Sequence, residues 1–435
     1  MRHVLMMAAK FVGLVCVALF GFLILLIATN GLGGGWPAAM ATVAASALVW
    51  WAFTLRPPVR LPGKIVLAVP AALSLLTVWL CVPVASQQRQ FQAPSSVAER
   101  RFWSLPTGSR LAYWHVEPRP GAPERAEPIV FVHGGPGGYA GEYNRRFLAR
   151  LASDGYDVWV YDQAGGGDSD LLPETAYSHE RNVADFKAVL DEIGAPKVSV
   201  ISQSYGAMIL ASGLADPTIR ARIAKAVFVE PGAYDFSVLD RVPEQNLYGG
   251  AKPYGSVPAA DRAASALAQP RVLLGLLLPR GNQFLGQDEA ANAFGGADMR
   301  EQRYRSYCAA DADRVDVNAL PIGLNLKANF AINQQGATEK RSLKAALAGS
   351  RVPAMVMLGE CSYVGRGYQT ALIDDYPAID RVAYVTGVGH SIWNGLDQHD
   401  AVALRALEEF FAGTPPTIRN YPTKADVPEF LRERK

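Results

Sequence analysis

Net charge and cysteine are both scarce in this sequence of 435 residues. Its 42 Lys and Arg residues nearly balance its 40 Asp and Glu residues, and the net charge is only +2. No basic run is interleaved with aromatic residues, so we expect no nucleic-acid partner. The sequence also lacks the C-x-x-C and H-E-x-x-H spacings of zinc sites, so we expect no metal site.

Hydrophobic residues are abundant instead, and they are concentrated before position 90. They make up 50% of the chain. Three charge-free stretches, at 11–29, 37–55 and 65–86, have about the 20 apolar residues that a helix needs to cross a bilayer. We therefore predict a membrane region over residues 1–91 with three transmembrane helices. A cleaved signal peptide is the alternative for the first stretch, but its apolar run exceeds a usual signal and two more follow.

Cationic residues near these stretches predict the orientation. Arg2 and Lys10 precede the first stretch, Arg56, Arg60 and Lys64 separate the second from the third, and the first link has no charge. By the positive-inside rule, the N-terminus and the second link are cytoplasmic. We therefore predict a multi-pass protein of a bacterial inner membrane with residues 92–435 extracytoplasmic.

Four cysteines are present, and two of them, Cys16 and Cys81, lie in the predicted spans. Cys308 and Cys361 are the two cysteines of the outer domain. An oxidising compartment permits a disulfide between them, whereas two buried free thiols are the alternative. We predict the disulfide.

Residues 92–435 show short β-rich runs alternating with amphipathic helical stretches, such as 179–194 and 401–413. This alternation predicts an α/β fold with a mostly parallel sheet and helices on both faces. The pattern breaks at about 236–350, where we expect a cap inserted over the carboxyl end of the sheet, with helical pieces near 259–278 and 297–310. The predicted strands are 110–117, 128–133, 156–162, 197–202, 225–230, 352–358 and 381–387.

Two motifs suggest acyl-transfer chemistry. In VSVISQSYGAMIL (198–210), a strand ends at Ser204 and a helix begins, which is the context of a nucleophile elbow. In FVHGGPGGY (131–139), glycines follow an apolar strand and can direct backbone N–H groups at a developing oxyanion. We predict Gly135 and Tyr205 as the two donors, with Gly134 as an alternative to Gly135.

Four segments give the chain a resemblance to a family. HGGPGG (133–138), YDQAGGGDS (161–169), the Ser204 elbow and GVGH (387–390) resemble the prolyl iminopeptidase-like branch of α/β-hydrolases over residues 100–413. The resemblance implies an α/β-hydrolase fold with a helical cap and aminopeptidase activity. Three positions depart from the branch: Ala164 replaces an arginine, Ser202 replaces the first glycine of the elbow, and Ser362 stands near the expected aspartate.

His390 is the best candidate for the general base, because it follows a strand and a GVG turn after Ser204 in the chain. The acid is less clear, since Ser362 carries no charge. We predict Glu230, which ends an apolar strand where some α/β-hydrolases, haloalkane dehalogenases among them, carry their acid. Glu360 is the alternative acid, and the remaining candidates are Asp235, Asp374 and Asp375.

These residues predict a membrane-anchored serine hydrolase that cleaves an amide or an ester through an acyl-enzyme and needs no cofactor. Its partners would be a small-molecule or peptide substrate and the lipid bilayer, with the oligomeric state left open. The resemblance favours an aminopeptidase. One alternative is a carboxylesterase or lipase-type hydrolase of acyl esters. The other is a catalytically inactive hydrolase fold that serves as a membrane-tethered binding module.

Overall fold

The computed structural model describes residues 95–241, 285–291, 308, 324–339, 341–393 and 397–417. The chain divides into two compact units, 1–89 with 264–290 and 90–263 with 291–435. The three predicted membrane spans lie outside the described residues. Within the described ranges, no helix combines the length and apolarity needed to cross a membrane. The fold that follows is that of the second unit.

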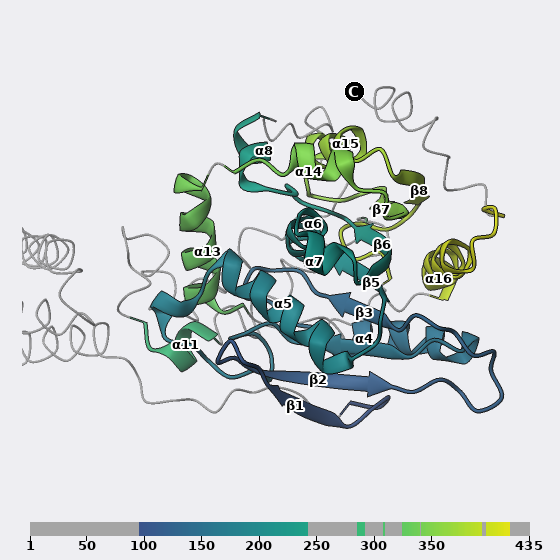
Figure 1. Ribbon diagram of the computed structural model, residues 1–435, viewed down its shortest axis with the longest axis horizontal. Helices are drawn as coiled ribbons and strands as arrows, with labels where there is room; N and C mark the ends of the chain where they lie inside the picture. Colours follow the sequence, from purple (N-terminus) through teal and green to yellow (C-terminus); the bar gives the residue numbers. More distant parts are fainter. Residues whose placement is uncertain are drawn as a thin grey trace, which may run out of the picture. The chain divides into compact units, whose positions relative to one another are not determined.

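An eight-stranded sheet forms the centre of this unit (Figure 1), in the order β1-β2-β4-β3-β5-β6-β7-β8. The pairs β1/β2 and β2/β4 are antiparallel and all later pairs are parallel. The predicted mostly parallel sheet is therefore confirmed. The strands are β1 (Arg100–Ser104), β2 (Arg110–Val116), β3 (Ile129–Val132), β4 (Val158–Tyr161), β5 (Val198–Gln203), β6 (Ile223–Val229), β7 (Ala354–Gly359) and β8 (Ile379–Val385).

Both faces of the sheet are covered, because alternate residues of each central strand enter different cores. In β3, Val130 and Val132 join one core while Ile129 and Phe131 join the other. The first core includes residues of α5 (His179–Ile193), α6 (Gly206–Ala215), α14 (Lys344–Gly349) and α15 (Arg366–Asp375). The second includes residues of α4 (Glu142–Leu148), the 3₁₀ helix η1 (Ala149–Asp154) and α16 (Asp397–Ala412).

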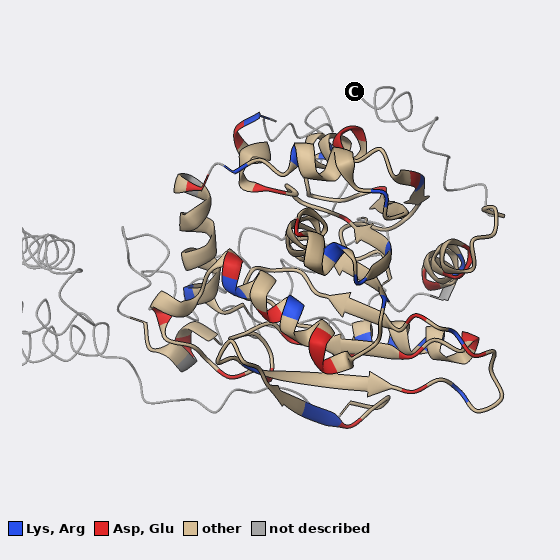
Figure 2. Ribbon diagram, in the orientation of Figure 1, with Lys and Arg blue, Asp and Glu red and all other residues tan. Residues whose placement is uncertain are grey.

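Helix α5 shows how local sequence sets these boundaries. The hydroxyl of Ser178 accepts a hydrogen bond from the N–H of Arg181 at 3.0 Å and caps the helix. Gly194 ends it with a φ of 71°, a backbone conformation that suits glycine. Phe186 and Val189 are fully buried, while acidic and basic residues occur along the rest of the helix (Figure 2). This amphipathic pattern explains why the predicted helix over 179–194 is confirmed.

Only parts of the predicted cap at 236–350 are described. In the second unit they are α8 (Phe236–Arg241), α13 (Leu326–Thr338) and α14, whereas α11 (Gln287–Ala291) falls in the first unit except for its last residue. The predicted helical pieces at 259–278 and 297–310 lie outside the described residues, apart from Cys308. The remaining short helices are η2 (Glu174–Ala176) and α7 (Pro217–Arg220).

Candidate active site

Ser204 lies on a sharp turn between β5 and α6. Its φ is 52°, a left-handed conformation that is uncommon for a residue with a side chain. Its N–H donates to the carbonyl of Val229 at 3.0 Å, which fixes the turn against the neighbouring strand β6. A Cβ at Gly206 would lie 2.2 Å from the carbonyl oxygen of Val132, so only glycine fits where α6 crosses the end of β3. The strand, turn and helix of the predicted elbow are all present.

The glycine-rich loop after β3 runs directly against this turn. A Cβ added to Gly134 would lie 2.9 Å from the Cβ of Ser204, and Gly135 has a φ of 148°. Within the described part of the chain, the backbone N–H groups of Gly134, Gly135 and Tyr205 donate to no acceptor. The structure therefore brings the predicted oxyanion donors beside Ser204 with free N–H groups.

His133 and Gln163 hold this loop in place. The Nε2 atom of His133 accepts the N–H of Gln163 at 2.8 Å, and its Nδ1 lies 2.6 Å from the carbonyl oxygen of Gly134. The side-chain amide of Gln163 donates to the carbonyl of His133 at 2.7 Å. Burial lowers the pKa of His133 to about 4, so the ring is neutral and carries its proton on Nδ1.

Asp162 ties the far end of the same loop to its own turn. One carboxylate oxygen accepts the N–H of Ala140 at 2.8 Å and the other accepts that of Asp168 at 2.9 Å. Burial raises the pKa of Asp162 to about 7, against the opposing effect of these N–H donors. Its carboxylate fixes backbone, so Asp162 is a structural residue of the loop.

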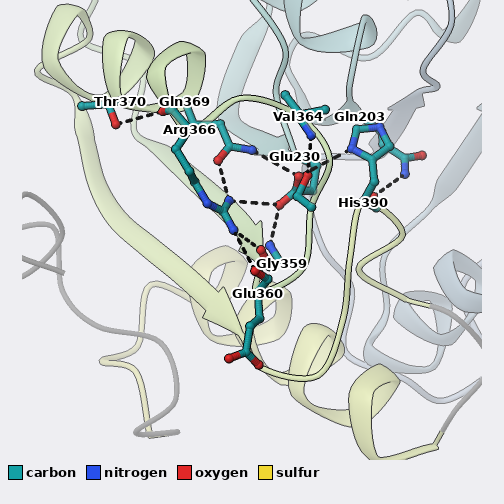
Figure 3. Close-up of polar contacts among 10 residues, drawn as sticks. Gln203, Glu230, Gly359, Glu360, Val364, Arg366, Gln369, Thr370 and His390 are labelled. Carbon is teal, nitrogen blue, oxygen red and sulfur yellow. Dashed lines mark hydrogen bonds and ion pairs between the residues drawn. The ribbon is translucent and has the colours of Figure 1, made fainter. Parts of the chain in front are cut away.

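Glu230 follows β6 and is completely buried, at 0% exposure. Its φ is 46°, the second left-handed non-glycine residue in the described ranges besides Ser204. One carboxylate oxygen, Oε2, lies 3.5 Å from Nδ1 of His390 and accepts the side-chain N–H of Gln369 at 3.1 Å. The other, Oε1, accepts the N–H of Gly359 at 2.5 Å. Figure 3 shows these contacts converging on one carboxylate.

Burial would raise the pKa of Glu230, but several neighbours outweigh it. The nearby ring of His390, the charge of Arg366 and the hydroxyl of Ser362 together lower this pKa below its usual value. Ser362 is itself fully buried. Ser362, which stands near the position of the expected aspartate, thus donates a hydrogen bond to the carboxylate of Glu230, at the end of the neighbouring strand β6.

Glu360 points elsewhere. Its Oε2 accepts the N–H of Gly387 at 3.0 Å, and Figure 3 shows its carboxylate directed away from His390. The structure therefore brings Glu230, and not Glu360, to the histidine. His390 is 8% exposed, and its carbonyl lies 3.5 Å from the side-chain amide of Gln203, which links the histidine loop to the end of β5.

Cys308 and Cys361 form a disulfide, as predicted, with their Cα atoms 5.1 Å apart. Together with Glu360 they are the only potential metal-ligand cluster in the described ranges. Their sulfur atoms are bonded to each other and offer no thiolate to an ion. The N–H of Cys361 also donates to the carbonyl of Val388 at 2.8 Å, so this residue joins the turn after β7 to the loop of His390.

Three residues of the site were not predicted from the sequence. Arg366 and Gln369, on α15, contact Glu230. Asn325 caps α13, because its side-chain oxygen accepts the N–H groups of Lys327 and Ala328. Its side-chain amide donates to the carbonyl of Gly165 at 3.0 Å. A helix cap and a basic residue in a first helical turn were the only local signals, and neither reveals a distant partner.

Residues 127–279 match the family described as "alpha/beta hydrolase fold". The chain has the α/β-hydrolase fold. Over 159 residues it is 26% identical to the 2-hydroxy-6-oxononadienedioate/2-hydroxy-6-oxononatrienedioate hydrolase of Klebsiella pneumoniae subsp. pneumoniae. The aligned region covers 36% of this chain and 53% of that relative. Over 116 residues it is 31% identical to the proline iminopeptidase of Lactobacillus delbrueckii subsp. lactis, with coverages of 26% and 38%.

This chain thus aligns with about half or less of the length of these curated relatives. The crystal structure of the proline iminopeptidase of Mycobacterium smegmatis is similar over 77% of this chain and 98% of that chain, with 20% identity and a TM-score of 0.45. The fold and the curated hydrolase and peptidase relatives support a hydrolytic enzyme.

Proposed function

We propose that this protein is a membrane-anchored serine hydrolase that cleaves an amide or ester bond through an acyl-enzyme. Ser204 is the nucleophile, His390 the general base and Glu230 the acid that orients the base. The backbone N–H groups of Gly135 and Tyr205 form the oxyanion hole. The observation that carries this proposal is the meeting of Ser204, on its left-handed turn, with the free N–H groups of the glycine loop.

The residues account for each proton in the reaction. Glu230 faces Nδ1 of His390, so that nitrogen carries the proton and Nε2 is free to accept one from the hydroxyl of Ser204. The oxygen of Ser204 attacks the substrate carbonyl, and the N–H groups of Gly135 and Tyr205 stabilise the oxyanion. His390 then protonates the leaving amine or alcohol. Water, deprotonated by His390, hydrolyses the acyl-enzyme and restores Ser204.

An aminopeptidase is the favoured activity, because proline iminopeptidases are among the relatives of this chain. Such an enzyme needs a carboxylate near the substrate amino group. The described acidic residues of the predicted cap include Asp240, Glu289 and Glu339. The carboxylate of Glu289 accepts the N–H of Gly286 at 3.3 Å. Glu244 and Glu301 lie outside the described residues.

The first test is labelling of the full-length protein in detergent by a fluorophosphonate, which phosphonylates an activated serine. We expect labelling of the wild type, none of Ser204→Ala, and undiminished labelling of Ser212→Ala, whose hydroxyl lies 2.8 Å from Nε2 of His179. Folded wild type without labelling would favour the inactive binding module. Labelling that persists in Ser204→Ala would remove Ser204 from the mechanism.

The second test separates peptidase from esterase. Aminoacyl arylamides, prolyl derivatives included, are compared with p-nitrophenyl esters by kcat/KM in the same preparation. We expect turnover of an arylamide with a free α-amino group and loss of that turnover when the amine is acetylated. Turnover confined to the esters would assign the esterase activity instead.

The third test concerns the membrane. The anchoring proposal rests on the charge-free stretches at 11–29, 37–55 and 65–86 and on their flanking cations. We expect the protein in the membrane fraction and an active C-terminal alkaline phosphatase fusion. A silent phosphatase fusion together with a fluorescent C-terminal fusion would place the hydrolase domain on the cytoplasmic side.

A further inference from the structure

Arg366 begins α15, and its side chain is directed inward. The side chain is 5% exposed, and its Nη1 lies 3.6 Å from Oε1 of Glu230. The guanidinium also donates to Oε1 of Gln369 at 2.5 Å and to the carbonyl of Gly359. Figure 3 shows Arg366 and His390 approaching Glu230 from opposite sides. One buried carboxylate therefore faces two basic groups, each at its own oxygen.

We propose that Arg366 is a positioning residue that keeps Glu230 ionised and thereby sets the lower pH limit of activity. This inference rests on the serine hydrolase function proposed above. The charge of Arg366 balances that of Glu230, so the resting acid and base together form a cluster close to neutral. Adding a proton to the Glu230–His390 pair makes this cluster positive, which is unfavourable in a buried site.

Arg366 therefore opposes protonation of the pair, whichever of its two members receives the proton. Activity that requires an unprotonated His390 then persists to a lower pH than it would without the arginine. Other groups facing the pair are weaker candidates for this effect, since Gln369 and Ser362 are uncharged and the Glu360 carboxylate is directed away. The ring of Tyr363 lies 4.7 Å from that of His390 and is uncharged at neutral pH.

The test measures the rate of fluorophosphonate inactivation against pH, because this rate needs no knowledge of the natural substrate. Full-length wild type is compared with Arg366→Met, which removes the charge, and with Arg366→Lys, which keeps it. The matched control is Arg241→Met. Arg241 also pairs with a carboxylate of α15, that of Asp375 at 3.2 Å, but it has no contact with Glu230.

In Arg366→Met, we expect the acid limb of the profile to move up by about 1–2 pH units, the usual effect of an opposite charge at this distance. Arg366→Lys should restore most of the shift, and Arg241→Met should leave the limb in place. A rate lowered equally at every pH, with an unmoved limb, would assign Arg366 a packing role and overturn the inference. A wild type that does not react at all would contradict the serine hydrolase function itself, which is a separate outcome.

Arg366→Met leaves the buried charge of Glu230 without its partner and could prevent folding. The double variant Arg366→Met/Glu230→Gln removes both charges. We expect its urea midpoint to lie above that of Arg366→Met, because breaking a buried pair is more destabilising than removing it whole. A double variant no more stable than Arg366→Met would show that charge pairing is not what Arg366 provides, and would overturn the inference by a route independent of activity.

Discussion

Strands β6 and β7 are neighbours in the sheet, yet their carboxyl ends differ. β6 is followed by Glu230, which is fully buried and turned by a positive φ toward the histidine. β7 is followed by Glu360, whose carboxylate binds the N–H of Gly387, and by Ser362, whose hydroxyl contacts Glu230. The carboxylate that faces His390 follows one strand, and two of its hydrogen-bond donors, Gly359 and Ser362, lie at the end of the other.

This difference shows what decides where a buried acid can lie. An isolated carboxylate in an apolar interior is strongly unfavourable, so it must receive donors or an opposite charge. The end of β7 and the start of α15 provide them through Gly359, Ser362 and Arg366. A second carboxylate at position 362 would instead place two anions together. Serine at 362 and glutamate at 230 are therefore complementary.

The largest expected effect separates the two glutamates. Glu230→Gln should lower kcat by roughly 10⁴, because an amide cannot stabilise the imidazolium that forms during catalysis. Glu360→Gln should keep near-normal kcat, since that carboxylate accepts the N–H of Gly387 and is directed away from His390. Steady-state kinetics of both folded variants checks this. A crippled Glu360→Gln beside an active Glu230→Gln would reverse the assignment.

A carboxylate placed at position 362, at the end of β7, should restore part of the activity that Glu230→Gln loses at the end of β6. In a Glu230→Gln background, Ser362→Asp should raise kcat by about 10- to 100-fold, because position 362 already faces the place that Glu230 occupies. Ser362→Asn in the same background is the matched control and should restore nothing. Equal rates for the two double variants would mean that residue 362 does not reach the histidine.

The disulfide should stabilise the β7 end without taking part in the chemistry. It joins residues 53 positions apart, so Cys308→Ser should lower the free energy of unfolding by about 2–4 kcal/mol. The kcat should change little, since neither sulfur contacts Glu230 or His390 in the described contacts. Urea unfolding with and without reductant measures the effect. Reductant should bring wild type to the level of the variant and leave the variant unchanged.

The smallest expected effect is the pH dependence of stability that Glu230 confers. Burial raises the folded pKa of Glu230, but the nearby His390 and the charge of Arg366 outweigh it and lower this pKa below its usual value of 4.5. As the pH falls, Glu230 is protonated in the unfolded chain before it is protonated in the folded one. Its contribution to the free energy of unfolding is therefore fully present above pH 4.5 and is lost as the pH falls through the folded pKa. The difference in unfolding free energy between wild type and Glu230→Gln should therefore shrink on acidification. A difference that stays constant down to acid unfolding would argue against a lowered pKa.

Local sequence predicted the seven strands β2 to β8 and the helices α5 and α16, because each has a continuous apolar run or an amphipathic period. It did not predict β1. That strand, RRFWS, buries Trp103 alone and pairs at the edge of the sheet, so it has no apolar pattern to detect. The elbow, the glycine loop and His390 were recognisable because each lies in a short motif next to a strand.

Arg366 and Gln369 were beyond such reasoning, because a helix that begins RGYQT looks like any polar helix start. Only the packing of α15 beside the ends of β6 and β7 turns these two side chains toward Glu230. A residue that acts through a distant partner has no local signature. The same holds for Asn325, whose cap is visible in the sequence while its contact with Gly165 is not.

The sequence by itself determined the strands β2 to β8, the turn of Ser204, the glycine loop and the pair Cys308 and Cys361, since these follow from local patterns and from which residues are present. It left the choice of acid open, with Glu230 and its alternative Glu360 each following an apolar strand. Of these two, the tertiary structure places Glu230 beside His390. Strand order places β6 beside β7, and the positive φ of Glu230 turns its side chain inward. There the buried carboxylate meets hydrogen-bond donors such as the N–H of Gly359 at the end of β7. The carboxylate of Glu360 was directed to the N–H of Gly387 and away from His390.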